Sequence, residues 1–346
     1  MKGHAYCGIT LAVLLTLTPL ATWAVTPSEG CGSNGWGSGT YTMDYAGVTR
    51  TFRVHVPKGY NRNNPAPLVT IYHGWGGNEN DFMRSKKVRS EADKRGYILV
   101  APRGLGSGAP DQSFNSWSFS GSTTGVDGDG GKICDDSITP DYSYDSCAGV
   151  KQNSCSWTQC QQNDVEFAVA LVGRIGENLC VDQDRVFASG GSNGGMFTWE
   201  LGQNPVSAPT FKAIAPVIGL PHRAYLDAQG KLEEMPVILI TGTRDTTVPP
   251  GDWNDPGYTT TSNGNDRYYY TGATAITESW AAAHGCEIVQ DAVPFNDGVR
   301  KADCRTFCSG DPGWPRVLDC RARMGHSYGL SWSWKLILKF FDQHSN

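Results

Sequence analysis

Short apolar runs along the chain predict the strands of a sheet. Residues 51–56 alternate polar and apolar side chains, as a half-exposed strand does. Several other runs are continuously apolar or β-branched, which is typical of strands buried on both faces of a parallel sheet. These runs lie at residues 67–72, 96–100, 185–189, 211–218 and 236–240, and a last strand is expected at 316–320.

Helical spacing fills the stretches between those runs. Asn163 and Asp164 precede a segment whose apolar residues recur at helical spacing up to Ile175, and further helices are predicted at residues 79–95, 195–201, 273–284 and 332–344. Strands that alternate with helices predict an α/β fold, with a mostly parallel sheet covered by helices on both faces. We expect residues 25–346 to form a single domain of this kind, since its length suits one large α/β unit.

One segment breaks the alternation. Residues 106–162 are rich in Gly, Ser, Asp and Cys and show no sustained periodicity. So long a connection inside a compact domain is usually functional. Because it follows the strand that ends at Val100, we predict a disulfide-tied insertion beside the functional edge of the sheet. The sequence leaves open whether this insertion forms a lid.

The first 24 residues predict a signal peptide. Lys2 precedes an apolar stretch at residues 8–20, which is too short to cross a bilayer, and small residues suit cleavage after Ala24. A retained membrane anchor is the alternative interpretation. The pattern favours a secreted, extracellular protein.

Cysteine usage agrees with export. Beyond Cys7 of the predicted signal peptide the chain has ten cysteines, and an even number in an exported protein indicates disulfides. We expect the group from Cys134 to Cys160 to pair largely within itself, and likewise the group from Cys286 to Cys320.

The overall charge argues against two classes of partner. The chain has 29 Lys and Arg against 34 Asp and Glu, a formal net charge of −5. Nucleic acid and anionic membrane surfaces favour basic proteins, so we expect neither as a partner once the signal peptide is removed. We expect a monomer.

A G-x-S-x-G pattern at residues 190–194 is the strongest chemical signal. It places Ser192 between the predicted strand at 185–189 and the helix that follows. Small residues two positions on either side allow the sharp strand-to-helix turn that exposes a nucleophilic serine. The start of the helix would also present N–H groups where an oxyanion develops. We predict that Ser192 is a nucleophile.

The order of residues along the chain then selects a base and an acid. In hydrolases whose nucleophilic serine lies on a strand-to-helix turn, the catalytic acid comes after the serine in the sequence and the histidine comes after the acid. That order excludes four of the seven histidines. His284 at a helix end and His344 in the C-terminal tail are less suitable, which leaves His326, on the loop between the last strand and the last helix. Asp245 follows the buried run that ends at Ile240 and is the predicted acid, while Asp252 and Asp255 are fallback choices.

A glycine-rich loop predicts an oxyanion hole. Residues 73–78, His-Gly-Trp-Gly-Gly-Asn, come directly after the buried run at 67–72. Glycines there allow a backbone N–H to reach the oxyanion. We predict that the N–H groups of Trp75 and Asn193 form the hole.

Together these motifs resemble those of the polyhydroxybutyrate depolymerase-like esterases, which include secreted feruloyl and acetylxylan esterases. The resemblance rests on residues 73–77, 186–196, 242–245 and 325–327 and runs from about Cys31 to the C-terminus. It implies an α/β-hydrolase fold, no cofactor, and a catalytic triad of Ser192, Asp245 and His326. We also expect no metal: cysteines and histidines lack zinc-site spacing, and the Asp127-Gly-Asp-Gly run lacks the distal Glu of a calcium loop.

The substrate is the least transferable part of the resemblance. The leading expectation is a hydroxycinnamoyl ester of plant cell-wall polysaccharide, with acetylxylan and an aliphatic polyester as alternatives. A secreted serine peptidase and a binding protein without activity are less favoured. Tyrosines 268–270 could stack on a ring or pack locally. The residues predicted to contact substrate are Trp75, Trp253, Tyr258 and Tyr328.

Overall fold

The structure is a computed structural model. It describes residues 1, 25–107, 113–139, 141–142, 144–150, 152–160, 163–226, 235–253, 259–262, 267–295, 298, 301–309 and 313–345. The predicted signal peptide, Asp255 and Tyr258 therefore lie outside the described residues, apart from Met1.

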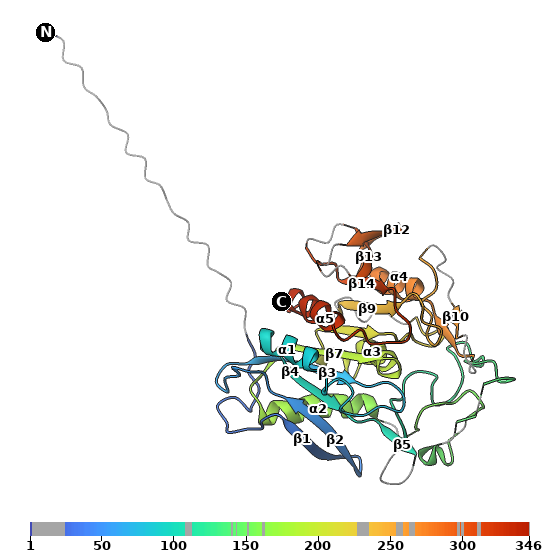
Figure 1. The fold of residues 1–346 in the computed structure, drawn as a ribbon, viewed down its shortest axis with the longest axis horizontal. Helices are drawn as coiled ribbons and strands as arrows, with labels where there is room; N and C mark the ends of the chain where they lie inside the picture. Colours follow the sequence, from blue (N-terminus) through green and yellow to red (C-terminus); the bar gives the residue numbers. More distant parts are fainter. Residues whose placement is uncertain are drawn as a thin grey trace.

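The described residues form a ten-stranded sheet in the order β1-β2-β4-β3-β7-β8-β9-β14-β13-β12 (Figure 1). Its six central strands are parallel. Their continuous apolar runs are buried on both faces, which confirms the predicted mostly parallel sheet. These strands are β3 (Ala66–Tyr72), β4 (Ile98–Pro102), β7 (Val181–Gly191), β8 (Ala213–Val217), β9 (Val237–Gly242) and β14 (Val317–Ala322).

Antiparallel strands extend both edges of the sheet. β1 (Gly39–Tyr45) and β2 (Val48–His55) form one edge, and β13 (Ala302–Ser309) and β12 (Glu287–Phe295) form the other. Of these, the sequence analysis predicted only β2, although β1 alternates in the same way with its apolar side chains partly buried. The described residues also contain two short antiparallel strand pairs: β5 (Leu105–Ser107) pairs with β6 (Ser113–Ser116), and β10 (Thr259–Thr261) pairs with β11 (Tyr269–Thr271).

Helices cover both faces of the sheet, as predicted. On one face, α1 (Lys86–Arg95) and α5 (Ser333–Gln343) pack against each other and share a core cluster. On the other, α2 (Asp164–Asn178), α3 (Asn193–Gln203) and α4 (Ala273–Ala283) contribute to a second cluster. Single 3₁₀ turns occur at Asp145–Cys147 and Ala208–Thr210.

Helix α1 begins seven residues later than the predicted 79–95. The Ser85 side chain caps it by accepting the N–H of Val88 at 3.4 Å. Before the cap, residues 79–84 form turns, and Glu79 is held by an ion pair with Arg103 at 2.6 Å. The side-chain cap and this ion pair favour the later start.

Five disulfides join the ten cysteines. Cys134–Cys155 and Cys147–Cys160 lie within the insertion, and Cys286–Cys308 and Cys304–Cys320 lie within the C-terminal group, so both predicted groupings are confirmed. Cys31–Cys180 ties the N-terminal segment to the residue before β7. Among the helices of the described residues, none combines the length and apolarity that a membrane crossing requires.

Candidate active site

Ser192 occupies a sharp turn between β7 and α3. Its φ of 55° and ψ of −121° are strained for a residue with a side chain, as expected where a nucleophile is held out from a turn. The neighbouring backbone passes so close that a Cβ on Gly190 would lie 2.2 Å from the carbonyl oxygen of Gly194. A Cβ on Gly194 would lie 2.2 Å from the carbonyl oxygen of Tyr72. Both positions therefore require glycine.

The structure brings Ser192, His326 and Asp245 together. The Ser192 hydroxyl is 2.8 Å from His326 Nε2, and His326 Nδ1 is 2.8 Å from Asp245 Oδ2. The other carboxylate oxygen of Asp245 accepts the backbone N–H groups of Thr247 and Val248, both at 2.9 Å. Asp245 is thus buried and fixed, while the edge of His326 stays accessible. Such an arrangement can remove the serine proton as the oxygen attacks.

The two predicted oxyanion loops lie beside this serine. Asn193 begins α3 next to Ser192, and Trp75 lies on the loop after β3. The N–H of Gly74 donates to the Tyr328 hydroxyl at 3.1 Å, which holds the loop beside the triad. His73 anchors the same loop from inside: its Nε2 accepts the N–H of Gly104 at 2.8 Å. Burial lowers the pKa of His73 to about 4, so this imidazole is neutral at pH 7.

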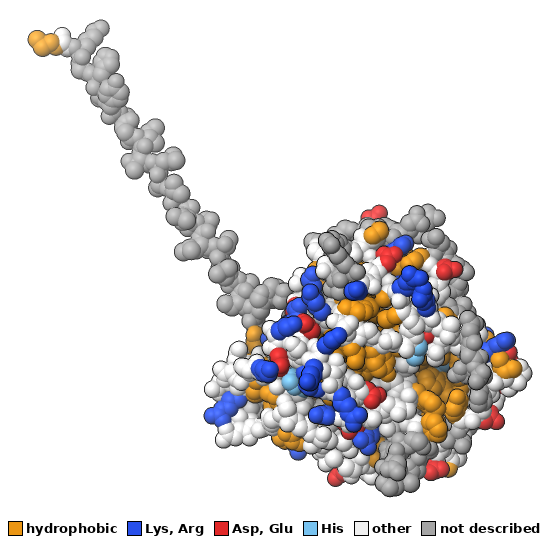
Figure 2. All heavy atoms as spheres, in the orientation of Figure 1, with side chains coloured by type: hydrophobic (Ala, Val, Ile, Leu, Met, Phe, Trp, Pro, Cys, Tyr) orange, Lys and Arg blue, Asp and Glu red, His pale blue; other side chains and the backbone are white. Residues whose placement is uncertain are grey.

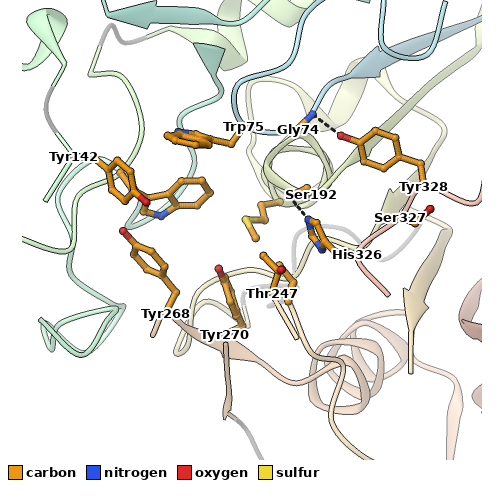
Figure 3. Close-up of a pocket in the computed structure, with 13 residues that line it drawn as sticks. Gly74, Trp75, Tyr142, Ser192, Thr247, Tyr268, Tyr270, His326, Ser327 and Tyr328 are labelled. Carbon is orange, nitrogen blue, oxygen red and sulfur yellow. Dashed lines mark hydrogen bonds between the residues drawn. The ribbon is translucent and has the colours of Figure 1, made fainter. Parts of the chain in front are cut away.

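A pocket of about 470 Å³ opens beside Ser192 and His326 (Figure 3). Aromatic rings form one side of it and face Ser192 and His326 across the cavity. Among the described lining residues there is no Asp, Glu, Lys or Arg. The lining consists of Gly74, Trp75, Tyr142, Trp157, Ser192, Met196, Thr247, Val248, Tyr268, Tyr270, His326, Ser327 and Tyr328.

A buried histidine supports the aromatic side of the pocket. His222 Nε2 accepts the indole N–H of Trp157 at 2.9 Å, and its Nδ1 lies 3.0 Å from the carbonyl oxygen of Tyr269. The His222 ring also stacks on Tyr270. The insertion reaches the same wall, because Cys134 pairs with Tyr268 through an isolated β-bridge. The long Cys-rich segment is therefore part of the pocket's construction.

Some of the residues predicted to contact substrate line the pocket, and Trp253 lies elsewhere. Trp75 and Tyr328 line the pocket, as do Tyr268 and Tyr270, whereas Tyr269 faces Arg223. Trp253 is outside the described lining, because its ring lies over the Arg321 guanidinium at 3.7 Å. Sequence reasoning missed Tyr142 and Trp157, both of which come from the insertion.

Asp127, in the run compared with a calcium loop, has structural partners. Asp127 accepts the Arg223 side chain at 2.5 Å and the N–H groups of Asp129 and Gly131 at 3.1 and 2.7 Å, so it stabilises its own turn. Within the described residues, no group of three or more His, Cys, Asp or Glu side chains could hold a metal ion.

Charge is distributed unevenly over the surface. On the face shown in Figure 2, Lys and Arg side chains gather over α1, which carries Lys86, Lys87, Arg89, Lys94 and Arg95. Hydrophobic side chains gather nearer the middle of that face (Figure 2). The overall charge of −5 therefore conceals a local basic surface.

The parallel sheet, the strained serine turn and the Ser-Asp-His order define an α/β-hydrolase fold. The solved acetyl xylan esterase from Aspergillus awamori shares this fold. It superposes with a TM-score of 0.50 at 15% identity and covers 88% of this chain and 99% of its own. This likeness confirms the fold expected from the sequence.

The chain is also similar in sequence to known feruloyl esterases. The chain is 27% identical over 203 residues to feruloyl esterase D of Neurospora crassa, covering 57% of this chain and 56% of that protein. It is 24% identical over 315 residues to a protein described as "probable feruloyl esterase C" from Aspergillus niger, covering 89% and 83%. No protein-family model matches the chain. The resemblance inferred from the four motifs is confirmed at the level of feruloyl esterase-like α/β-hydrolases.

Proposed function

We propose that this protein hydrolyses carboxylic esters with Ser192 as its nucleophile. Ser192 Oγ attacks the ester carbonyl carbon while His326 Nε2 takes the hydroxyl proton. His326 returns that proton to the leaving alcohol oxygen as the ester C–O bond breaks. Water then attacks the acyl-serine, His326 takes its proton, and the acid leaves as Ser192 regains its hydrogen. Asp245 holds the imidazole tautomer and stabilises the imidazolium.

The oxyanion of each tetrahedral intermediate needs donors that are already in place. The N–H groups of Asn193 and Trp75 are our proposed donors, because they belong to the two loops that flank Ser192. The Gly74 N–H is not available for this role, since it donates to the Tyr328 hydroxyl.

The aromatic wall opposite Ser192 is the observation that supports a hydroxycinnamoyl ester as substrate. Trp75, Tyr142, Trp157, Tyr268 and Tyr270 surround a cavity with no Asp, Glu, Lys or Arg in its described lining. A feruloyl group is a flat, uncharged ring at the end of a conjugated acyl chain, so it would stack on such a wall with its ester at the serine. The alcohol part would be a cell-wall polysaccharide.

Export belongs to the same proposal. Five disulfides form readily in an oxidising compartment and rarely persist in a reducing one. We propose that residues 1–24 direct secretion and are removed, and that the mature protein acts as an extracellular monomer without a cofactor. Mass spectrometry of the secreted protein would locate the new N-terminus.

Parallel release assays on methyl ferulate, acetylxylan and polyhydroxybutyrate test the substrate. We expect kcat/KM for methyl ferulate to exceed that for a methyl acetate control by at least about tenfold. The reason is that the aromatic ring of the ferulate would be buried in the apolar pocket, which acetate cannot fill. A preference for acetylxylan or the polyester would replace the feruloyl assignment and leave the esterase assignment intact. Faster cleavage of an anilide than of the matching ester would indicate a peptidase.

The nucleophile is tested by Ser192→Ala, which should lose both ester turnover and labelling by a fluorophosphonate. Ser189→Ala is a matched control: Ser189 lies three residues earlier in β7, and its hydroxyl donates to the carbonyl oxygen of Ala215 at 2.8 Å, away from the pocket. Ester turnover by the Ser192 variant would exclude the mechanism. Labelling of the wild-type protein without any turnover would favour a binding role.

A further inference from the structure

Residues 115–117 contact both loops that supply the proposed oxyanion donors. On the side of the β3 loop, the Asn115 carbonyl accepts the N–H of Gly76 at 2.8 Å, and the Asn115 side chain donates to the carbonyl of Gly77 at 2.8 Å. The indole N–H of Trp117 donates to the carbonyl of His73 at 3.1 Å. Three hydrogen bonds therefore fix the loop on either side of Trp75.

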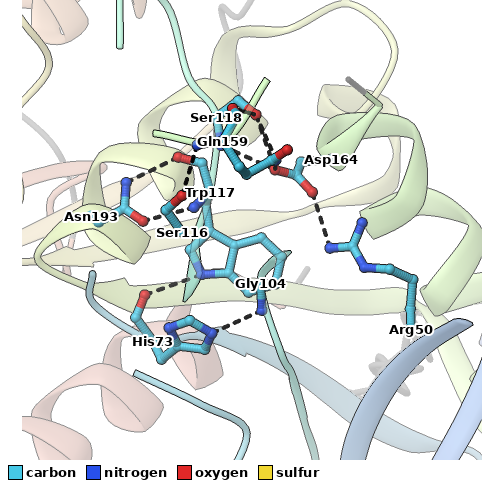
Figure 4. A network of polar contacts seen from close by, with 9 residues as sticks. All are labelled: Arg50, His73, Gly104, Ser116, Trp117, Ser118, Gln159, Asp164 and Asn193. Carbon is cyan, nitrogen blue, oxygen red and sulfur yellow. Dashed lines mark hydrogen bonds and ion pairs between the residues drawn. The ribbon is translucent and has the colours of Figure 1, made fainter. Parts of the chain in front are cut away.

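Residues 115–117 also form hydrogen bonds to Asn193, the residue after Ser192 (Figure 4). Asn193 accepts the backbone N–H of Trp117 through Oδ1 at 2.8 Å and donates through Nδ2 to the Trp117 carbonyl at 3.0 Å. Asn193 is fully buried, so this two-point contact is shielded from water. Asn193 thereby links its proposed donor N–H to a residue 76 positions earlier in the chain.

We propose that Trp117 is a positioning residue that sets the spacing between the two oxyanion donors, Asn193 and Trp75. The inference rests on the proposed ester hydrolysis. Its physical reason is that an oxyanion hole works only when its donors are held in advance at hydrogen-bond distance from the developing charge. Trp117 bonds to both loops through its indole and its backbone, and its ring is locked by packing against Tyr72 and Phe197.

Residues further along the insertion, together with the start of α2, support residues 115–117. Ser116 Oγ accepts the N–H of Gln159 at 3.0 Å, and Ser118 and Gln159 both bond to the carboxylate of Asp164. Asp164 in turn pairs with the buried Arg50 at 3.0 Å (Figure 4). Gln159 immediately precedes Cys160 of a disulfide. The Cys-rich insertion thus supports the oxyanion hole in addition to lining the pocket.

Trp117→Phe is the direct test, since it keeps an aromatic ring and removes the indole N–H. We expect kcat per active site to fall about tenfold with KM unchanged, on methyl ferulate and on p-nitrophenyl acetate alike, because every ester passes through the oxyanion. Active sites are counted by complete fluorophosphonate labelling. Trp280→Phe is the matched control: Trp280 is equally buried, and its indole N–H has no partner among the described residues.

The rate of fluorophosphonate labelling is a second readout that does not require turnover. The phosphoryl oxygen would occupy the oxyanion hole, so the rate constant should fall about tenfold in Trp117→Phe and stay near wild type in Trp280→Phe. Equal kcat and equal labelling rates in the two variants would overturn the positioning role. Wild-type protein that labels but hydrolyses no ester would refute the proposed function, and the labelling rates would still decide the role of Trp117.

If Trp117→Phe does not fold, Asn115→Ala tests the same positioning role. It removes the side-chain bond to Gly77 and leaves Trp117 untouched. We expect kcat and the labelling rate to fall about threefold, since one of several contacts to the loop is lost. A rise in KM with unchanged kcat would place the segment in substrate binding and contradict the inference.

Discussion

The hydroxyl of Tyr328 accepts a hydrogen bond from the backbone N–H of Gly74 at 3.1 Å, across 254 positions of sequence. Its ring stacks on Phe82 with centroids 4.7 Å apart. The loop after β3 is thus fastened to the loop that carries His326. Burial raises the pKa of Tyr328 to about 12, so the hydroxyl stays protonated through the physiological range.

Removing that hydroxyl should weaken the oxyanion loop without removing a donor. In Tyr328→Phe the ring can still stack on Phe82, but the Gly74 N–H loses its acceptor. We expect kcat to fall about fivefold, the equivalent of one hydrogen bond of ~1 kcal/mol, with little change in KM. Steady-state kinetics on p-nitrophenyl acetate measure this. A variant with wild-type kcat would show that Gly74 is held adequately by other contacts.

Asp245→Asn should leave the protein folded and nearly inactive. The amide oxygen of the new side chain could still accept the N–H groups of Thr247 and Val248, so the turn should persist. The amide cannot stabilise the imidazolium or enforce the required tautomer of His326, and the comparable change in serine hydrolases lowers kcat by about 10⁴. Thermal unfolding checks the fold, and ester hydrolysis checks the rate. A loss of less than about tenfold would point to another acid, of which Asp252 is the described alternative.

The meeting of Ser192, Asp245 and His326 could be predicted because it depends on local chain geometry. Ser192 was recognisable from the strand, the glycines and the helix around it. Asp245 and His326 followed from their places after predicted strands. The central parallel strands were also predictable, since burial on both faces requires uninterrupted apolar residues.

The pocket and the edges of the sheet were less predictable for physical reasons. Tyr142, Trp157 and Trp117 lie in a segment without periodicity, and their positions depend on long-range contacts such as the bond from Trp157 to His222. Strands β1 and β13 pair at or near an edge and mix polar with apolar residues, so no continuous run marks them.

Trp253 offers a test between a structural and a substrate-binding role. Its ring lies 3.7 Å from the Arg321 guanidinium, which pairs with the fully buried Asp319 at 2.7 Å. The ring covers this ion pair, so Trp253→Ala should lower the free energy of unfolding by about 1–2 kcal/mol. We expect KM for methyl ferulate to stay unchanged. Urea titration and kinetics on the same preparation decide the matter, because a raised KM at wild-type stability would support the substrate contact predicted from the sequence.

Two buried histidines should make the fold sensitive to acid. His73 accepts the Gly104 N–H and His222 accepts the Trp157 indole N–H, so protonation of either Nε2 would break a buried hydrogen bond. Burial lowers the pKa of both from 6.5 to about 4. The unfolded chain therefore binds these protons at higher pH than the folded chain does. The stabilisation is fully present above pH 6.5 and is lost as the pH falls from 6.5 to about 4.

His222→Gln isolates one of these contributions. Glutamine does not titrate, so the variant lacks one of the two groups that favour the unfolded state in acid. Between about pH 7.5 and pH 4.5, wild-type protein should lose about 2 kcal/mol more stability than the variant. The pKa of His222 rises from about 4 to 6.5 on unfolding, so over most of this interval the unfolded chain holds a proton that the folded chain does not. Urea unfolding at the two pH values, followed by tryptophan fluorescence, measures the difference. Equal losses in both proteins would mean that His222 is not kept neutral by its burial beneath the pocket wall.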